Sequence, residues 1–514
     1  MPRTCDRWLD ISDPSWLRLG KRGGSAFLIV GCVLIGSWQL SYANDPGKID
    51  RTYRKAPGMR GAYRRSLPRF FYFFYYTGKF PITMQAQNGV LRDDEWTARR
   101  FLSIANPYLR NEDYATIRTG DLGKIFLLYP DLLRVDSPQK ATLWTFNRIL
   151  GIGSLLCLFC SLSLVHHRML AVLLVLLFGS NPFQLYHLYM PPANIWAYPM
   201  CVANLVLAIN APLLLARKPN RWAFLLPLLT GAFLASVREV RTEPALIGAS
   251  LLVAYAIAPR IRWSARVGLL SLFVVGALAC SLVWGHYWSA KFREATEIVR
   301  RAGGKPFPEL SNMHHALWHP IWWGLGDLGT DKGYRSSDRA AYAYAIPIVN
   351  KRFGAKYERQ PRSYLLENVH ADGSGYRIKP ETLPEYTAVL RDKILADVTS
   401  DPGWYLRILA ERTKRAFRGA TPIRFAFGDV TLDVPFSAWL ALPILGIALA
   451  ARRWREAALL LFYTPTSLPT ILISSRPGFD NIAAFHIAAF AVVCCWGVRA
   501  AGRLGSRRHW KATR

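Results

Sequence analysis

Long apolar runs separated by short polar loops are the dominant pattern along the chain. The runs extend over about 17 to 22 residues with few or no charges, which is the length that crosses the hydrocarbon core of a bilayer as an α-helix. The pattern predicts an all-α polytopic membrane protein with about ten transmembrane helices. The predicted spans are residues 25–43, 147–165, 169–186, 195–215, 222–237, 243–258, 267–285, 433–451, 456–474 and 481–498.

The charges of the connecting loops predict the orientation of these spans. Every second loop is short, basic and almost free of acids, and the tail after Arg499 adds further basic residues. Short basic loops mark the cytoplasmic side, so we expect both termini in the cytoplasm. The same alternation leaves two long segments, 44–146 and 286–432, on the extracytoplasmic side. The basic loops are 166–168, 217–221, 260–266 and 452–455.

The long segments divide the chain into three predicted domains. Residues 1–285 form an N-terminal transmembrane module that includes the first extracytoplasmic loop. Residues 286–432 form an extracytoplasmic segment with an interfacial helix, and residues 433–514 form transmembrane hairpins with a basic cytoplasmic tail. The first span ends at Ala43 in a sequence that also resembles a signal-peptidase site. Its long apolar run favours a retained membrane anchor.

The composition narrows the class of partner and the compartment. A formal net charge of +31 would suit a nucleic-acid partner, but the basic residues cluster in short loops between apolar runs, so we expect no nucleic acid. Cys157 and Cys160 have a CxxC spacing inside an apolar helix, where two small packed residues are the favoured interpretation. The long polar segments contain no cysteine, which excludes a disulfide framework there. These features, with many Arg and Ala residues, favour a bacterial inner (plasma) membrane.

Two stretches of the outer segments predict helices at the membrane surface. Residues 70–76 form an aromatic run that follows several arginines, a composition typical of the membrane–water interface. Residues 402–418 alternate apolar and basic side chains at roughly helical spacing. We expect this second stretch to lie as a helix on the outer leaflet.

An acidic motif in the first outer segment is the candidate catalytic centre. Asp93, Asp94 and Glu95 stand together before a tryptophan in the motif DDEW, although acids are scarce in the chain. A carboxylate near the bilayer edge is partly desolvated, and the resulting rise in its pKa makes it a better general base at neutral pH. The alternative is that these acids complement the first turn of a helix through Leu102.

A second cluster lies between two apolar runs, at the outer end of a helical hairpin. It contains Arg238, Glu239, Arg241 and Glu243. Ionisable groups near membrane depth usually line a cavity or pair with each other. The spacing of the two arginines puts them on one helix face, where they would bind a phosphate. The alternative is an ion-pair cluster that only joins helices.

Two further outer stretches offer substrate-binding groups. His315 and His319 have the i, i+4 spacing of zinc ligands, but no carboxylate stands at the position that a zinc protease requires, and we assign no metal site. Together with Trp318 they would instead hold a sugar or phosphate by hydrogen bonding and stacking. The alternative is a structural role within the fold. Arg476 and Asp480, in the loop between the last two spans, lie at the same predicted membrane level.

The layout resembles the GT-C superfamily of polytopic glycosyltransferases, which includes protein mannosyltransferases and lipid A aminoarabinose transferases. The similar features are a first outer loop with an acidic motif, interfacial helices, short basic cytoplasmic loops, the turn at Asn181 and the closing segment 404–409. In that family a carboxylate of the first outer loop acts as base or orients the acceptor. Asp93 and Asp94 are the residues that match it.

The resemblance also implies the reaction. The family's donors are sugars on polyprenyl phosphate, and the acceptor is extracytoplasmic. We therefore expect an inverting transfer in which Arg238 and Arg241 stabilise the phosphate leaving group. A divalent cation is left open as a cofactor. In this chain Asp45 and Asp50 lie closer to the first span, as the family's acid often does, and they rank second as catalytic residues.

Two other function classes compete with this interpretation. A ligase or polymerase that moves a preassembled glycan would resemble this chain in using outer-loop arginine and histidine without a carboxylate base, so His314, His315 and His319 would matter more than Asp94. A transporter or flippase tends to show inverted repeats and polar groups at mid-membrane. The charges here gather at the outer edge instead.

Overall fold

The computed structural model describes the parts of the chain whose placement is defined. These are residues 85–87, 114–116, 144–165, 168–181, 198–216, 219–240, 246–258, 261–301, 317–354, 357–359, 366–369, 375–378, 380, 383–427, 430–467, 471–473 and 482–512.

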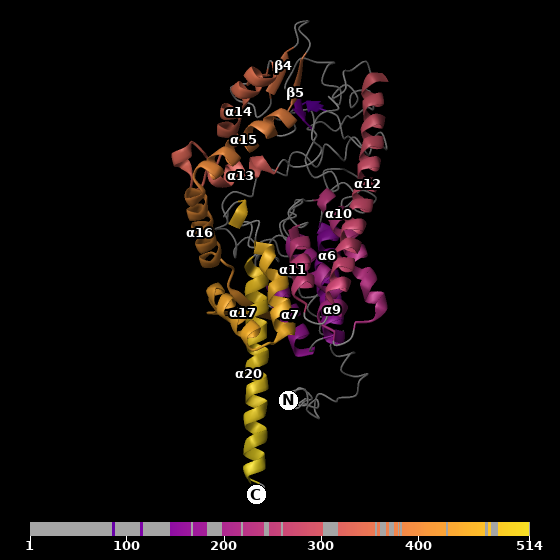
Figure 1. Cartoon of the computed structure of the whole chain (residues 1–514), viewed down its shortest axis with the longest axis vertical. Coiled ribbons are helices and arrows are strands. Elements are labelled where there is room, and N and C mark those ends of the chain that lie inside the picture. Colours follow the sequence, from indigo (N-terminus) through magenta and orange to yellow (C-terminus); the bar gives the residue numbers. More distant parts are fainter. Residues whose placement is uncertain are drawn as a thin grey trace.

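A bundle of apolar helices forms one part of the molecule (Figure 1). Each predicted span that lies within the described residues overlaps one of these helices; the span 25–43 lies outside them. The bundle comprises α6 (Trp144–Val165), α7 (Arg168–Gly179), α9 (Tyr198–Leu214), η5 (Arg221–Leu225), α10 (Leu226–Val240), α11 (Ile247–Ile257), the first part of α12 (Trp263–Arg301), η9 (Ala438–Leu440), α17 (Ala441–Ala450), α18 (Trp454–Tyr463), η10 (Thr464–Ser467) and the first part of α20 (Ile482–Ala512).

Three helical stretches among the described residues are long and apolar enough to cross a membrane. They are Arg221–Val240, Trp263–Ala290 and Ile482–Gly502. Only 11% of the most apolar window of Trp263–Ala290 is buried inside the molecule, and its large exposed side chains include Leu278 and Leu282. An apolar helix that turns such side chains outward suits a lipid environment. The other predicted spans appear as shorter apolar helices, so ten full spans remain a prediction.

Buried polar side chains join the helices of the bundle. Asn210 of α9 donates to Thr230 Oγ1 of α10 at 2.8 Å and accepts from the hydroxyl of Tyr255 in α11. Asn204, also on α9, accepts from Tyr463 Oη of α18 at 2.7 Å. Interhelical hydrogen bonds of this kind contribute up to about 2 kcal/mol each inside membrane bundles, and here they fix the neighbours of α9.

A second, smaller helical unit stands at one end of the bundle, opposite the end from which the basic C-terminal half of α20 extends (Figure 1). It comprises α13 (Trp318–Leu325), η7 (Thr330–Lys332), α14 (Asp338–Phe353), α15 (Pro384–Ser400) and the start of α16 (Pro402–Arg418). It has its own core, rich in Trp and Tyr, with Trp322, Tyr386 and Trp404 almost fully buried. The predicted domain boundary at residue 285 falls within α12, which continues as one helix from the bundle toward this end.

Short antiparallel strands accompany the helices, so a purely α-helical chain was too narrow an expectation. β1 (Gln85–Gln87) pairs with β2 (Tyr114–Thr116). β3 (Tyr357–Arg359), β4 (Leu366–Val369) and β5 (Gly375–Ile378) form a three-stranded sheet. β6 (Ile423–Phe427) and β7 (Val430–Val434) form a hairpin. The predicted span 433–451 therefore begins later, at η9, because its first residues belong to β7.

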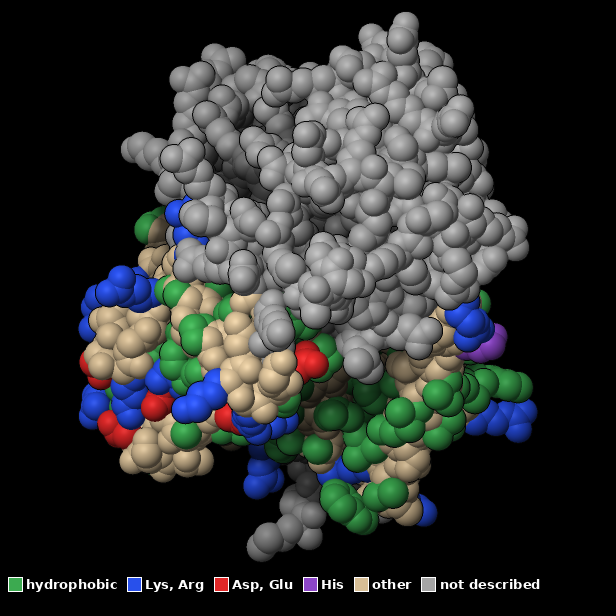
Figure 2. All heavy atoms as spheres, turned by 90° about the horizontal axis from the view of Figure 1, so that it is seen from above, with side chains coloured by type: hydrophobic (Ala, Val, Ile, Leu, Met, Phe, Trp, Pro, Cys, Tyr) green, Lys and Arg blue, Asp and Glu red, His purple; other side chains and the backbone are tan. Residues whose placement is uncertain are grey.

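The helix predicted at 402–418 is confirmed as α16, and it connects the two parts (Figure 1). Trp404 and Ile408 belong to the core of the smaller unit, whereas Phe417 belongs to the core of the bundle. Charged side chains cover the side of the molecule over α14–α16, and hydrophobic side chains cover the side over α12 (Figure 2). Placement of α16 on a lipid leaflet remains a prediction.

Candidate functional site

The described residues include four of the predicted site residues, at the end of α10 and the start of α13. These four are Arg238, Glu239, Trp318 and His319. The other predicted site residues lie outside the described residues, so their positions stay predictions. They are Asp93, Asp94, Arg241, Glu243, His315, Arg476 and Asp480.

The carboxyl group of Glu239 is buried between α10 and α12. Glu239 is 7% exposed, and its Oε2 accepts a hydrogen bond of 2.7 Å from Trp288 Nε1. Trp288 is itself 1% exposed and stacks on Trp284 with ring centroids 5.9 Å apart. A buried carboxyl group held by an indole N–H is a defined polar site in an otherwise apolar interface.

A second hydrogen-bonded group lies one helical turn from this pair on the same interface. Trp284 Nε1 donates to Ser236 Oγ at 3.0 Å, and Ser236 Oγ also lies 3.3 Å from Cys280 Sγ. Both groups join α10 to α12 close to the end that carries the smaller unit. Together, these contacts fix the position of the Glu239 carboxyl group between the two helices.

Arg238 points away from this interface and is exposed in the last turn of α10. A cation there interacts favourably with the negative end of the helix dipole, and its guanidinium is open to a ligand. Arg238 and Glu239 are adjacent in sequence, but Arg238 is exposed and Glu239 is buried. The predicted pairing of Arg238 with Arg241 involves a residue outside the described part of the chain.

His319 lies in the core of the smaller unit rather than on an open surface. Its Nδ1 is 2.7 Å from Tyr386 Oη and its Nε2 is 3.2 Å from Asp338 Oδ1. The imidazole ring is stacked against Tyr342 with ring centroids 5.9 Å apart. Both ring nitrogens thus contact groups of the same chain, and His319 holds α13 against α14 and α15. Trp318 packs against the same core.

The described residues contain no group of three or more His, Cys, Asp or Glu side chains arranged to hold a metal ion. The ring nitrogens of His319 contact the carboxylate of Asp338 and the phenol of Tyr386.

A cluster of lysines, acids and aromatic rings stabilises the smaller unit. Asp397 Oδ2 accepts hydrogen bonds from Tyr334 Oη at 2.7 Å and from Lys393 Nζ at 2.9 Å. The Lys393 ammonium also lies 4.9 Å from the centroid of the Tyr334 ring, and Trp404 Nε1 donates to Asp331 Oδ1 at 3.2 Å. Burial works to raise the pKa of Asp397, but the hydrogen bonds from Lys393 and Tyr334 hold it below its usual value of 3.8.

This lowered pKa predicts a pH-dependent stability. Because the folded-state pKa of Asp397 is below the unfolded value, the ionised carboxylate stabilises the fold above about pH 4, and this stabilisation is lost as the pH falls through the folded pKa. We expect Asp397→Asn to cost about 1–2 kcal/mol at pH 7 and progressively less as the pH falls below about 4. Thermal unfolding across this pH range measures the difference. Asp392→Asn on the same helix is the comparison. Hydrogen bonds from Arg352 and Arg391 lower the pKa of that carboxyl as well, but it is more exposed and its ion pair is screened by salt, so its effect should be smaller; equal effects at both positions would contradict the prediction.

Arg412 connects α16 to two other segments, and the sequence did not indicate it. It is one of the basic residues of the helix predicted at 402–418, and it is 0% exposed. Its Nη1 donates to the backbone oxygens of Leu472 at 2.9 Å and Ile471 at 3.3 Å. Burial lowers the pKa of Arg412 below its usual value. The spacing Trp404, Ile408, Arg412 puts all three on one helix face, which was the available signal.

Helix α13 packs against Arg412 and the 471–473 segment. A Cβ atom at Gly324 would overlap the backbone oxygen of Ile473 and would lie 3.0 Å from Arg412 Nη2. Only a glycine allows this close approach of two backbones. The structure thus brings together α13, α16 and the 471–473 segment, and two of these adjoin predicted site stretches: α13 contains His319, and 471–473 precedes the loop with Arg476 and Asp480.

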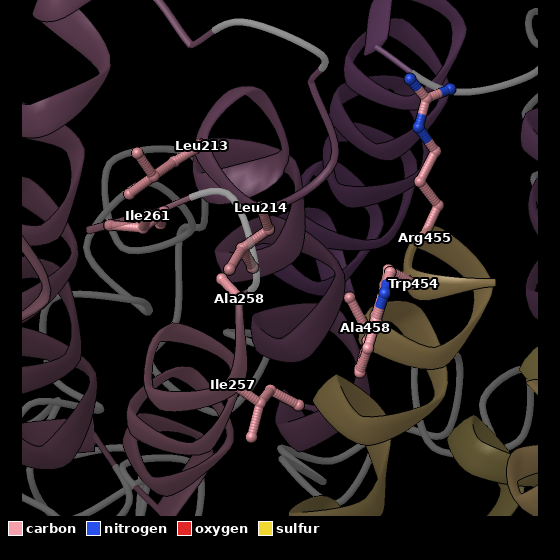
Figure 3. Close-up of a pocket in the computed structure, with 8 residues that line it drawn as sticks. All are labelled: Leu213, Leu214, Ile257, Ala258, Ile261, Trp454, Arg455 and Ala458. Carbon is pink, nitrogen blue, oxygen red and sulfur yellow. The ribbon is translucent and has the colours of Figure 1, made fainter. Parts of the chain in front are cut away.

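A small hollow at the opposite end of the bundle lies between α9, α11 and α18 (Figure 3). Its volume is about 20 Å³, the space of roughly one water molecule. Arg455 extends away from the aliphatic residues that line it (Figure 3). The hollow is too small for a sugar or a lipid head group. It is lined by Leu213, Leu214, Ile257, Ala258, Ile261, Trp454, Arg455 and Ala458.

No protein-family model, curated protein or solved structure matches the chain.

Proposed function

We propose that the chain is an integral membrane glycosyltransferase of the GT-C type. It would move a sugar from a polyprenyl-phosphate donor to an extracytoplasmic acceptor, such as a cell-envelope glycan, lipid or protein, and would invert the anomeric configuration. The membrane lipid supplies the donor, and both termini lie in the cytoplasm of a bacterial inner membrane.

The observation that carries the proposal is the position of the ionisable side chains relative to the apolar bundle. The smaller unit stands at one end of the bundle (Figure 1). Arg238 and Glu239 are at the end of α10, and Arg412 lies between the two cores. A lipid-linked sugar has its phosphate at the boundary between hydrocarbon and water, so an enzyme that uses it needs charged groups at that level.

The mechanism follows from the residues assigned to each role. Asp94 or Asp93 takes the proton of an acceptor hydroxyl while that oxygen attacks the anomeric carbon. The bond from the anomeric carbon to the phosphate oxygen breaks, and the polyprenyl phosphate leaves with the electron pair. Arg238 stabilises the charge that develops on the phosphate. A single displacement inverts the anomeric centre, by analogy with inverting glycoside hydrolysis.

The contacts of His319 disfavour one form of the alternative, a histidine-dependent glycan ligase. A histidine that serves as base needs a ring nitrogen within reach of the acceptor. Both ring nitrogens of His319 contact side chains of the same core. This histidine therefore orients helices, and a ligase would have to rely on His314 or His315, which lie outside the described residues.

Single substitutions test the proposal. We expect Asp94→Asn or Asp93→Asn to lower transfer from a radiolabelled lipid-linked sugar by about 10²- to 10⁴-fold, the usual contribution of a general base. Arg238→Gln should lower it by roughly tenfold or more, as expected for a lost charge-assisted contact to the leaving group. Asp392→Asn makes the same chemical change at an exposed acid of α15 and should leave transfer unchanged. Full activity in all three site variants would remove the mechanism.

A further inference from the structure

The guanidinium group of Arg412 has two hydrogen-bonding edges, and the described residues use only one of them. Nη1 donates to the backbone oxygens of Ile471 and Leu472. Nε and Nη2 form the other edge, and both are buried without a hydrogen-bond partner among the residues that the structure describes. These two nitrogens carry parallel N–H groups, which is the geometry that binds a carboxylate or phosphate through two oxygens.

Arg424 shows in the same chain what this edge binds when it is filled. Its Nε and Nη2 donate to the two carboxylate oxygens of Asp433, at 2.5 Å and 2.7 Å. That pair is partly exposed, since the Asp433 side chain is 47% accessible. Arg412 presents the same two nitrogens in a more deeply buried place, where an anion would be bound more strongly because water competes less.

A buried guanidinium that is compensated by two carbonyl oxygens alone is costly. Removing a charge from water costs several kcal/mol, and a buried charge is normally paired with one of opposite sign. Asp327 is the acid whose charge acts on Arg412, but its carboxylate makes no hydrogen bond to the guanidinium in the described structure. An anionic ligand at the Nε–Nη2 edge would supply the missing negative charge and the missing hydrogen-bond acceptors.

The surroundings of the edge indicate where such a ligand belongs. Arg412 stands on the helix face of α16 between Ile408, in the core of the smaller unit, and Phe417, in the core of the bundle. A Cβ atom at Gly324 would already lie 3.0 Å from Nη2, so α13 packs directly against this nitrogen. This is the level at which an apolar bundle meets a polar unit, and it is where the phosphate of a membrane lipid lies.

We infer that the Nε–Nη2 edge of Arg412 binds a phosphate group, namely that of the lipid-linked sugar donor. The choice of the donor as carrier rests on the proposed function; the affinity of the edge for phosphate rests on its geometry. Arg412 then holds the donor from the side of α13 and α16.

Binding measurements on the purified full-length protein test this inference. Tryptophan fluorescence would be followed while a polyprenyl phosphate or the matching polyprenol is added. We expect Arg412→Lys to raise the Kd for the phosphate about tenfold or more, because the bidentate contact is lost, and to leave the Kd for polyprenol unchanged. Arg415→Lys, an exposed position of the same helix, should bind like wild type. An unchanged Kd in Arg412→Lys would overturn the inference.

Further arms separate the sources of phosphate and the internal alternative. Inorganic phosphate and phosphatidylglycerol should compete only weakly; displacement of the probe by either at equal concentration would overturn the assignment to the donor. Asp327→Asn should leave binding unchanged or tighten it. If Asp327→Asn weakened binding as much as Arg412→Lys, the edge would belong to an internal ion pair and the inference would fall.

Cross-linking of the wild-type protein decides the matter even if Arg412→Lys does not fold. A polyprenyl phosphate with a photoreactive diazirine next to the phosphate should label peptides that contain residues 324–327, 408–412 or 471–473. Adducts confined to the ends of α10 and α12 would overturn the role of Arg412 and leave the proposed function standing. Specific labelling by polyprenyl phosphate at neither place would contradict the proposed function itself.

Discussion

Replacing Gly276 by alanine is expected to destabilise the helical bundle by about 2–3 kcal/mol, the cost of forcing an extra methyl group into a packed interface. A Cβ atom at this position would overlap the backbone oxygen of Leu228 in α10, and a Cβ atom at Gly231 would overlap the backbone oxygen of Phe273 in α12. Backbone atoms cannot rotate away as a side chain can, so the two helices must separate. Close contact through small residues is a common basis for helix association in membranes.

The same helix offers matched controls with the opposite expected sign. Gly268 and Gly285 lie on α12, and no atom lies within 4 Å of a Cβ placed at either. Alanine is favoured over glycine in a helix interior by about 0.5–1 kcal/mol, so Gly285→Ala should raise the melting temperature in detergent while Gly276→Ala lowers it. Gly231→Ala should resemble Gly276→Ala. Equal shifts at positions 276 and 285 would show that α10 and α12 do not pack through these glycines.

The positions of the apolar helices could be predicted from the sequence because one physical requirement dominates them. A stretch that is apolar over many residues must leave water, and a helix satisfies its own backbone while it does so. The predictions for α6 and α10 therefore fall close to the observed helices, and the span predicted at 267–285 lies within the longer α12. The neighbours of each helix could not be predicted, since they depend on single side chains. Asn210, for example, selects α10 and α11 as partners of α9 through Thr230 and Tyr255.

The candidate site was less accessible to sequence reasoning for a related reason. Any ionisable residue is a candidate for a functional site in the sequence, but its role depends on how deeply the fold buries its side chain, and the sequence does not determine that. His319 was expected to bind substrate, and the structure engages both of its ring nitrogens within the core. Arg412 is one of several basic residues of the predicted interfacial helix, and nothing in the sequence alone distinguishes it from the exposed ones, yet it is fully buried. The sequence of an amphipathic helix does not show which of its faces is buried. The packing of Trp404 and Ile408 shows that Arg412 lies on the buried face of α16.

Removing the indole N–H of Trp288 is expected to have the second large effect. Trp288→Phe keeps a six-membered aromatic ring but removes the indole N–H, which leaves the carboxyl group of Glu239 without its 2.7 Å hydrogen bond. An unsatisfied buried acceptor costs about 1–3 kcal/mol, and a carboxyl group lies toward the upper end, so we expect a loss of about 2–3 kcal/mol. Trp284→Phe removes a hydrogen bond to the hydroxyl of Ser236. Hydrogen bonds of this kind between membrane helices average about 0.6 kcal/mol, which makes Trp284→Phe the smaller effect.

A double-mutant cycle distinguishes the lost hydrogen bond from lost packing. If Trp288 acts by satisfying Glu239, then Glu239→Leu should remove most of the cost of Trp288→Phe, because replacing both partners by apolar groups of similar size is nearly neutral. The cycle would then give a coupling of about 1–2 kcal/mol, within the range seen for residues in direct contact. If the two costs simply add, the indole contributes volume alone, and Glu239 is held by groups outside the described residues. Thermal unfolding of the four proteins in one detergent separates these outcomes.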